Sequence, residues 1–165
     1  MLVAIVTAAP QGTVSVGVDV ESVARVERHL DAVIGTVPPG ERPAGGWTPM
    51  SLTRSWVRRE AVLKAAGTGL LAPPSDLVLA SADGPPAVAR SGGTLPVPSR
   101  LALHDVGLPQ LERSEGAPQQ ASYLAALGLC STDPSRAPLS HVAVADGAAL
   151  LARHQGSART VTPED

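Results

Sequence analysis

The segment Ser51–Ala66 carries the strongest helix signal in the sequence and constrains the fold more than any other segment. Thr48 or Ser51 can cap its N-terminus, Pro49 suits a first helical turn, and Gly67 suits a C-terminal stop. Elsewhere regular structure is often interrupted, because the chain contains 16 Gly and 16 Pro among its 165 residues. The hydrophobic fraction of 44% still indicates a folded, globular protein.

Several segments are typical of short β-strands. Val14, Val16, Val18 and Val20 alternate with small or polar residues along Thr13–Val20, which predicts a strand with one buried face. The apolar segment Leu2–Thr7 precedes it across a Gln-Gly turn, so the two predict an antiparallel hairpin. Further predicted strands are Leu77–Ala80 with Ala87–Ala89, and Ser99–Val106 with Ser122–Cys130, the last of which also suits a short helix.

These elements predict an α/β (α+β) fold, a small antiparallel sheet with the Ser51–Ala66 helix packed on it. A helix is predicted over Ser22–Ile34, and one face of it carries Val23, Val26, Leu30 and Val33. Loops are expected over Gly35–Pro49 and over Arg113–Gln120, and we expect the first of these to be mobile. We expect one domain over residues 1–130. A linker over Ser131–Leu139, a weak element over His141–His154 and a disordered tail over Gln155–Asp165 are expected to follow.

Charge and composition exclude several classes of function. A net charge of −2 argues against a nucleic-acid-binding protein, which is usually clearly basic. The single cysteine, Cys130, excludes an intrachain disulfide and a cysteine-rich zinc site. The longest apolar stretch, Met1–Pro10, is too short to span a bilayer and lacks the basic start of a signal peptide. We therefore expect a cytoplasmic protein without a membrane partner.

Two acidic residues mark the end of the alternating strand. Asp19 and Glu21 are two residues apart, so both carboxylates leave the strand on the face opposite Val18 and Val20. Adjacent carboxylates repel each other, and a cation between them relieves the repulsion. A solvated polar face is the alternative interpretation, and the pair alone does not decide between the two.

The predicted helix adds a second set of charged residues. Trp56, Glu60 and Lys64 are four residues apart and form one stripe, and Lys64 is the only lysine beside 12 arginines. A surface ion pair between Glu60 and Lys64 is the simplest interpretation. If the helix packs across the hairpin, however, Glu60 joins Asp19 and Glu21, and three carboxylates with phosphate oxygens and waters suit Mg²⁺. Lys64 would then neutralise a metal-bound phosphate, as phosphoryl-type transfer requires.

The two motifs together resemble a known family. Gly17–Glu21 reads G-V-D-V-E, and Trp56–Leu70 reads W-V-R-R-E-A-V-L-K-A-A-G-T-G-L. This pair of motifs is similar to the 4′-phosphopantetheinyl transferase superfamily. The resemblance extends over about Leu2–Leu129, and the second acid, Glu21, favours the two-lobed, surfactin-synthetase-activator type.

The resemblance implies an activity and a role for each matched residue. The family transfers the phosphopantetheine arm of coenzyme A, a co-substrate, to a serine of an acyl or peptidyl carrier protein. Carried over, Asp19, Glu21 and Glu60 would bind Mg²⁺ together with the coenzyme A pyrophosphate. Glu60 would also be the general base, and Lys64 would hold the phosphates and the leaving group. Arg59 matches a basic position that approaches the coenzyme.

The chain also departs from the family pattern. It resembles mainly the second lobe of the two-lobed type, whose first lobe holds the 3′-phosphate and adenine of the coenzyme. Two expectations follow: the chain self-assembles into a homo-oligomer, or it is a truncated homologue. One alternative function is an inactive homologue that only binds coenzyme A or a carrier protein. Another is a structural domain whose acidic face is fortuitous.

Overall fold

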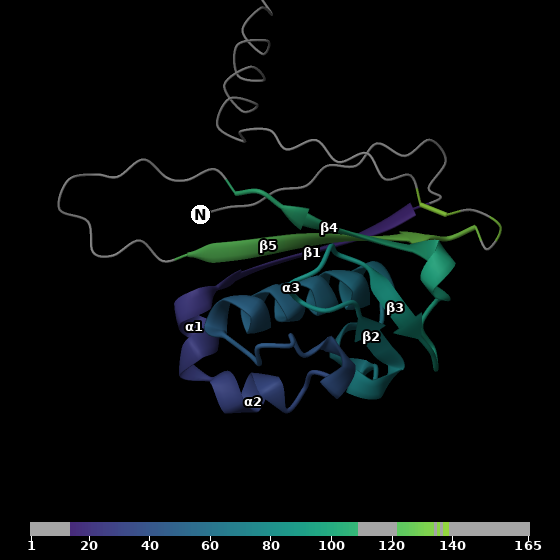
Figure 1. The fold of residues 1–165 in the computed structure, drawn as a ribbon. Helices are drawn as coiled ribbons and strands as arrows, with labels where there is room; N and C mark the ends of the chain where they lie inside the picture. The colour runs from purple at the N-terminus through teal and green to yellow at the C-terminus, as the bar shows by residue number, and fades with distance from the viewer. Residues whose placement is uncertain (1–13, 109–121, 134, 136, 139–165) are drawn as a thin grey trace, which may run out of the picture.

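The core of the fold is a three-stranded antiparallel sheet crossed by one long helix. The computed structural model describes residues 14–108, 122–133, 135, 137 and 138. Strands β1 (Val14–Ser22), β5 (Tyr123–Ser131) and β4 (Leu101–Val106) lie in the order β1-β5-β4, and helix α3 (Pro49–Ala65) packs against all three (Figure 1). The predicted fold class, a small antiparallel sheet with a packed long helix, is confirmed.

The predicted helix Ser51–Ala66 forms as α3, which begins at Pro49 and ends at Ala65. The Thr48 side chain accepts a hydrogen bond from the Ser51 backbone N–H at 3.1 Å, and Ser51 Oγ accepts one from the Thr48 backbone N–H at 3.0 Å. This reciprocal capping box satisfies two donors that a helix start leaves unpaired. Pro49 occupies the first helical position, and Gly67 follows the last turn with a φ of 73°.

A pair of glycines allows α3 to lie close against the sheet. Gly17 of β1 pairs with Gly128 of β5 in the antiparallel register. A Cβ at Gly17 would lie 2.2 Å from the Ala61 carbonyl oxygen, and one at Gly128 would lie 2.4 Å from it. Ser15 Oγ donates to the Ala65 carbonyl at 2.6 Å on the same face of β1. The crossing of β1, β5 and α3 is therefore set by backbone contact.

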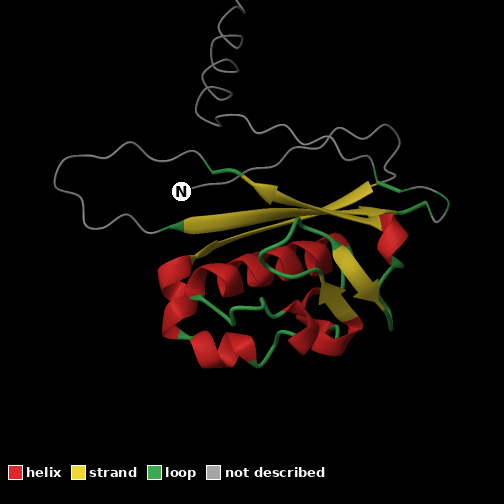
Figure 2. Ribbon diagram, in the orientation of Figure 1, coloured by secondary structure: helices red, strands yellow, loops and turns green. Residues whose placement is uncertain are grey.

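The smaller elements lie around α3, and Figure 2 shows the helices on one side of the three-stranded sheet. Helices α1 and α2 precede α3, a two-stranded ribbon of β2 and β3 follows it, and short 3₁₀ turns lie in some of the connecting segments. The helices and strands are α1 (Val23–Arg28), α2 (Leu30–Ile34), β2 (Leu77–Leu79) and β3 (Val88–Ser91), and the turns are Pro39–Glu41, Gly69–Leu71, Pro74–Asp76 and Pro98–Arg100. No helix in the described ranges is long and apolar enough to cross a membrane.

Two expectations about local structure need correction, and one open alternative is resolved. The predicted helix Ser22–Ile34 is two short helices, which are separated at His29. Both a strand and a short helix suited Ser122–Cys130, and the strand is the one that forms, as β5, paired with β4 as predicted. The segment Gly35–Pro49 contains the turn Pro39–Glu41, and its Glu41 is fully buried. The loop is therefore anchored to the rest of the protein, and the expectation that it is mobile was wrong.

The prediction about the buried face of β1 was also wrong. We expected the valine face of β1 to pack on the core, but α3 covers the opposite face, which carries Ser15 and Gly17. The β1 valines are half-buried. The main core lies between α3 and the sheet, and it includes Val57 and Leu103.

Some predicted segments lie outside the described residues. These are Leu2–Thr7 of the predicted hairpin, the loop Arg113–Gln120, part of the linker Ser131–Leu139, and the last two segments, His141–His154 and Gln155–Asp165.

Candidate functional site

Strand β1 and helix α3 bring a carboxylate and an ammonium group into direct contact. Lys64 Nζ lies 2.7 Å from Asp19 Oδ1 and also donates to the Val18 carbonyl at 3.1 Å. The Lys64 side chain is 45% exposed, whereas that of Asp19 is only 15% exposed. Two groups that are 45 residues apart in the sequence therefore form one ion pair at the edge of a solvent-accessible site.

Glu60 lies one helical turn before Lys64 and is buried beside this ion pair. The residue is 8% exposed, and its Oε1 atom is buried without a hydrogen-bond partner. Burial raises the pKa of the Glu60 carboxyl, and the negative charge of Asp19 raises it further. The positive charges of Lys64 and Arg59 act in the opposite direction. The predicted ion pair between Glu60 and Lys64 is not the one that forms, since Lys64 pairs with Asp19.

Glu21, the third predicted metal ligand, is held by its own segment. Its Oε1 accepts a hydrogen bond from the Ser22 backbone N–H at 2.8 Å, and its Oε2 lies 3.5 Å from Arg25 Nη1. Across the described ranges, no three Asp, Glu, His or Cys side chains are grouped closely enough to hold a metal ion. The structure thus brings Asp19, Glu60 and Lys64 together and leaves Glu21 in local contacts.

Arg59 faces the interior of the protein. Its guanidinium forms an ion pair with Glu41 and donates to the Leu77 carbonyl at 3.0 Å and the Pro74 carbonyl at 3.3 Å. Desolvation lowers the pKa of Arg59, and the Glu41 carboxylate opposes that effect. In this structure the guanidinium connects α3 to β2 and to the turn that contains Glu41.

Glu41 is the site-adjacent residue that sequence reasoning missed. It is fully buried, and besides pairing with Arg59 it accepts hydrogen bonds from Ser55 Oγ at 2.6 Å and the Leu79 backbone N–H at 2.9 Å. Its sequence environment, a segment rich in proline and glycine, is typical of an exposed loop. Nothing in that pattern indicates a buried acid, because the burial depends on a partner 18 residues away.

Arg58 is also buried. It binds both carboxylate oxygens of Asp105, with Nε–Oδ1 at 2.7 Å and Nη2–Oδ2 at 2.6 Å. Arg58 and Arg59 therefore both stabilise the packing of α3.

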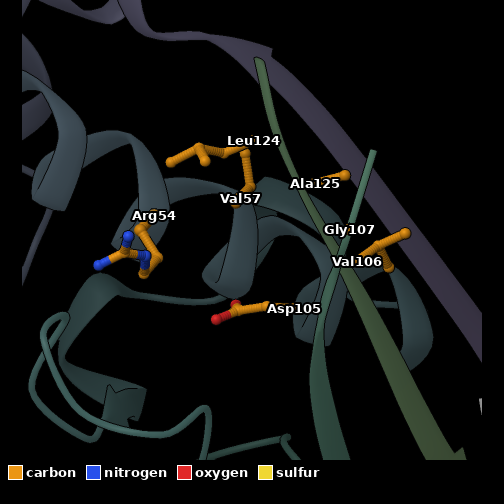
Figure 3. Close-up of a pocket in the computed structure, with 7 residues that line it drawn as sticks. All are labelled: Arg54, Val57, Asp105, Val106, Gly107, Leu124 and Ala125. Carbon is orange, nitrogen blue, oxygen red and sulfur yellow. The ribbon is translucent and has the colours of Figure 1, made fainter. Parts of the chain in front are cut away.

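In the part of the chain that the structure describes, two of the cavities adjoin α3. One, of about 160 Å³, lies beside Glu60 and Arg59 and has mainly apolar walls formed by Trp56, Leu63, Ala72 and Pro74. Figure 3 shows the other, of about 180 Å³, where Arg54 and Asp105 lie among apolar side chains. Only the first contacts a residue of the predicted site.

The donor set at Asp19 and Glu60 fits a magnesium ion. Mg²⁺ in phosphoryl-transfer sites is held by one or two carboxylates, with substrate phosphates and water completing its shell. Asp19 and Glu60 supply two carboxylates whose charges already interact, and Glu60 Oε1 has no other partner. A magnesium site of this kind does not require a third protein ligand, although Glu21 is on the same face of β1 as Asp19.

Comparison with known protein families identifies the family of this chain. The family model described as the 4′-phosphopantetheinyl transferase superfamily matches residues 15–126. The match begins in β1 and ends within β5, so it includes Asp19, Glu60 and Lys64. No curated protein matches the chain. The matched segment covers well over half of the sequence, and the chain belongs to the 4′-phosphopantetheinyl transferase superfamily.

Proposed function

We propose that this protein transfers the 4′-phosphopantetheine group of coenzyme A to a serine of an acyl or peptidyl carrier protein, with Mg²⁺ as cofactor. The observation that carries the proposal is the meeting of Asp19, Glu60 and Lys64 across β1 and α3. These residues lie within the segment that matches the family. We further propose that the reaction takes place in the cytoplasm and that the chain resembles the two-lobed members.

The carboxylates of this site would hold the metal. Asp19 and Glu60 are its proposed ligands, and Glu21 is a third once its contacts with Ser22 and Arg25 are given up. When bound, Mg²⁺ supplies positive charge to the pyrophosphate of the coenzyme. The family role of Arg59 as a coenzyme contact remains a prediction, and its buried pair with Glu41 supports a positioning role for α3 instead.

In the proposed reaction, one P–O bond forms and one P–O bond breaks. The serine oxygen attacks the phosphorus that carries the pantetheine arm, and a new P–O bond forms. The bond between that phosphorus and the bridging oxygen breaks, and adenosine 3′,5′-bisphosphate leaves with the bridging oxygen. Glu60 takes the serine proton, directly or through water. Lys64 neutralises charge on the phosphates.

Release of adenosine 3′,5′-bisphosphate, followed by chromatography, tests the proposal. With apo carrier protein, coenzyme A and Mg²⁺, we expect release that stops when the carrier is omitted. Glu60→Gln and Asp19→Asn are expected to reduce the rate by about 100-fold or more, as loss of a base or an electrostatic contact does. Glu27→Gln, an exposed acid of α1, is the matched control and should leave the rate unchanged.

Two outcomes would contradict the proposal in different ways. Release at the wild-type rate by Glu60→Gln would show that the site lies elsewhere. Binding of coenzyme A or carrier protein without release, by the folded wild-type chain, would favour the alternative function of a homologue that only binds them.

A further inference from the structure

The ammonium group of Lys64 is close to two carboxylates, those of Asp19 and Glu60, but it forms an ion pair only with Asp19. Lys64 Nζ contacts Asp19 Oδ1 at 2.7 Å, while Glu60 Oε1, which is buried next to them, has no partner. The charges of Asp19 and Lys64 both act on Glu60. Lys64 therefore occupies the place of a positive ion beside Asp19, and it does so with a side chain that is 45% exposed.

A metal ion bound by Asp19 and Glu60 would compete with the ammonium group of Lys64 for the carboxylate of Asp19. A metal ion bound to either carboxylate oxygen of Asp19 would lie close to Nζ, so the two cations would repel each other. Lysine, a point charge on a flexible stem, can leave without disturbing the helix. Among the described residues, the ammonium group donates one further hydrogen bond, to the Val18 carbonyl.

We propose that Lys64 exchanges partners: it pairs with Asp19 in the ion-free protein, is displaced when a divalent cation binds, and then binds a phosphate oxygen of the substrate. The inference rests on the proposed function and adds an order of events to it. When the divalent cation displaces Lys64, the ammonium group becomes available for a phosphate oxygen. The ion pair with Asp19 therefore opposes metal binding, and it keeps the ammonium group paired until the metal binds.

The sequence makes the exchange directly measurable, because Lys64 is the only lysine. In protein labelled with ¹⁵N at the lysine side chain, the ammonium resonance reports Lys64 alone. We expect this resonance to shift on addition of Mg²⁺ without nucleotide, and to shift again when coenzyme A is added. Calorimetry on the same samples measures whether Mg²⁺ binds.

Variants separate displacement from general repulsion. Lys64→Met is expected to bind Mg²⁺ about threefold to fivefold more tightly than wild type without coenzyme A, since one partly exposed ion pair no longer has to break. Lys64→Arg keeps the pair and should bind like wild type or more weakly. Arg28→Gln removes an exposed charge of α1 that is not in this ion pair, and it is the matched control.

The outcomes distinguish this inference from the function on which it rests. Binding of Mg²⁺ with no change in the Lys64 resonance, or with equal affinity in Lys64→Met, contradicts the exchange and leaves the transferase proposal standing. No uptake of Mg²⁺ by wild type or variants contradicts both. Tighter binding by Lys64→Met together with the two-step shift supports the exchange.

Discussion

Glu60 is the residue on which the site depends most, and its burial sets its behaviour with pH. Its pKa is raised by desolvation first and by Asp19 second. A carboxyl whose pKa is higher in the folded than in the unfolded state favours folding at low pH, where it is protonated in both states. That contribution is lost as the pH rises through the raised pKa, because the folded protein must then hold a buried charge.

Glu60→Gln should therefore change stability in a pH-dependent way. Without metal, we expect the variant to be more stable than wild type by about 1 kcal/mol near pH 8, since it removes a negative charge that burial and Asp19 disfavour. Near pH 4 the difference should shrink towards zero. Thermal unfolding in EDTA across this range checks the prediction, with Glu27→Gln as control. A constant difference at all pH values would contradict the account.

The buried pair of Glu41 and Arg59 gives a second prediction. Glu41→Gln leaves the Arg59 charge buried without its counterion, and we expect a loss of about 3 kcal/mol in the free energy of unfolding. The double variant Glu41→Gln with Arg59→Met should lose less than the sum of the single changes. Urea unfolding measures all three. A loss below about 0.5 kcal/mol in Glu41→Gln would show that the pair does not anchor the loop.

Among the elements, β1 and α3 alone build the site, and their crossing is fixed by the absence of side chains at Gly17 and Gly128. Gly17→Ala should cost about 3 kcal/mol, because its Cβ would meet the Ala61 carbonyl, a backbone atom that cannot move freely. The matched control is Gly45→Ala, where a Cβ meets nothing within 4 Å. Denaturant unfolding compares them, and equal stabilities would contradict the close approach.

The same crossing shows how far the sequence could predict the site. The period of two in β1 and of four in α3 predicted which residues share a face, so the meeting of Asp19 with Glu60 and Lys64 was foreseeable once the helix packed on the sheet. The ion-pair partner of Lys64 could not be predicted from the sequence. An ion pair between Glu60 and Lys64 on the same helix is weak, and Asp19 of β1 takes its place.

In the whole molecule, the sheet carries α3 on one face only. Val16 and Val18 of β1 pair in register with Leu129 and Leu127 of β5, so these side chains share the opposite face. Sequence alternation showed two different faces but could not show which one the helix would cover. The glycine pair and Ser15 decide this, since they admit the helix backbone and give it a hydrogen bond. Similarly, the anchoring of the loop by Glu41 depends on long-range partners that a local pattern does not contain.

The most direct test of the central claim is the intact mass of an apo carrier protein after incubation with this chain, coenzyme A and Mg²⁺. We predict that the carrier gains one phosphopantetheine, that EDTA prevents the gain, and that Glu60→Gln does not produce it. No gain across several acyl and peptidyl carrier proteins, with the chain folded, would contradict the claim that β1 and α3 form a working transferase site.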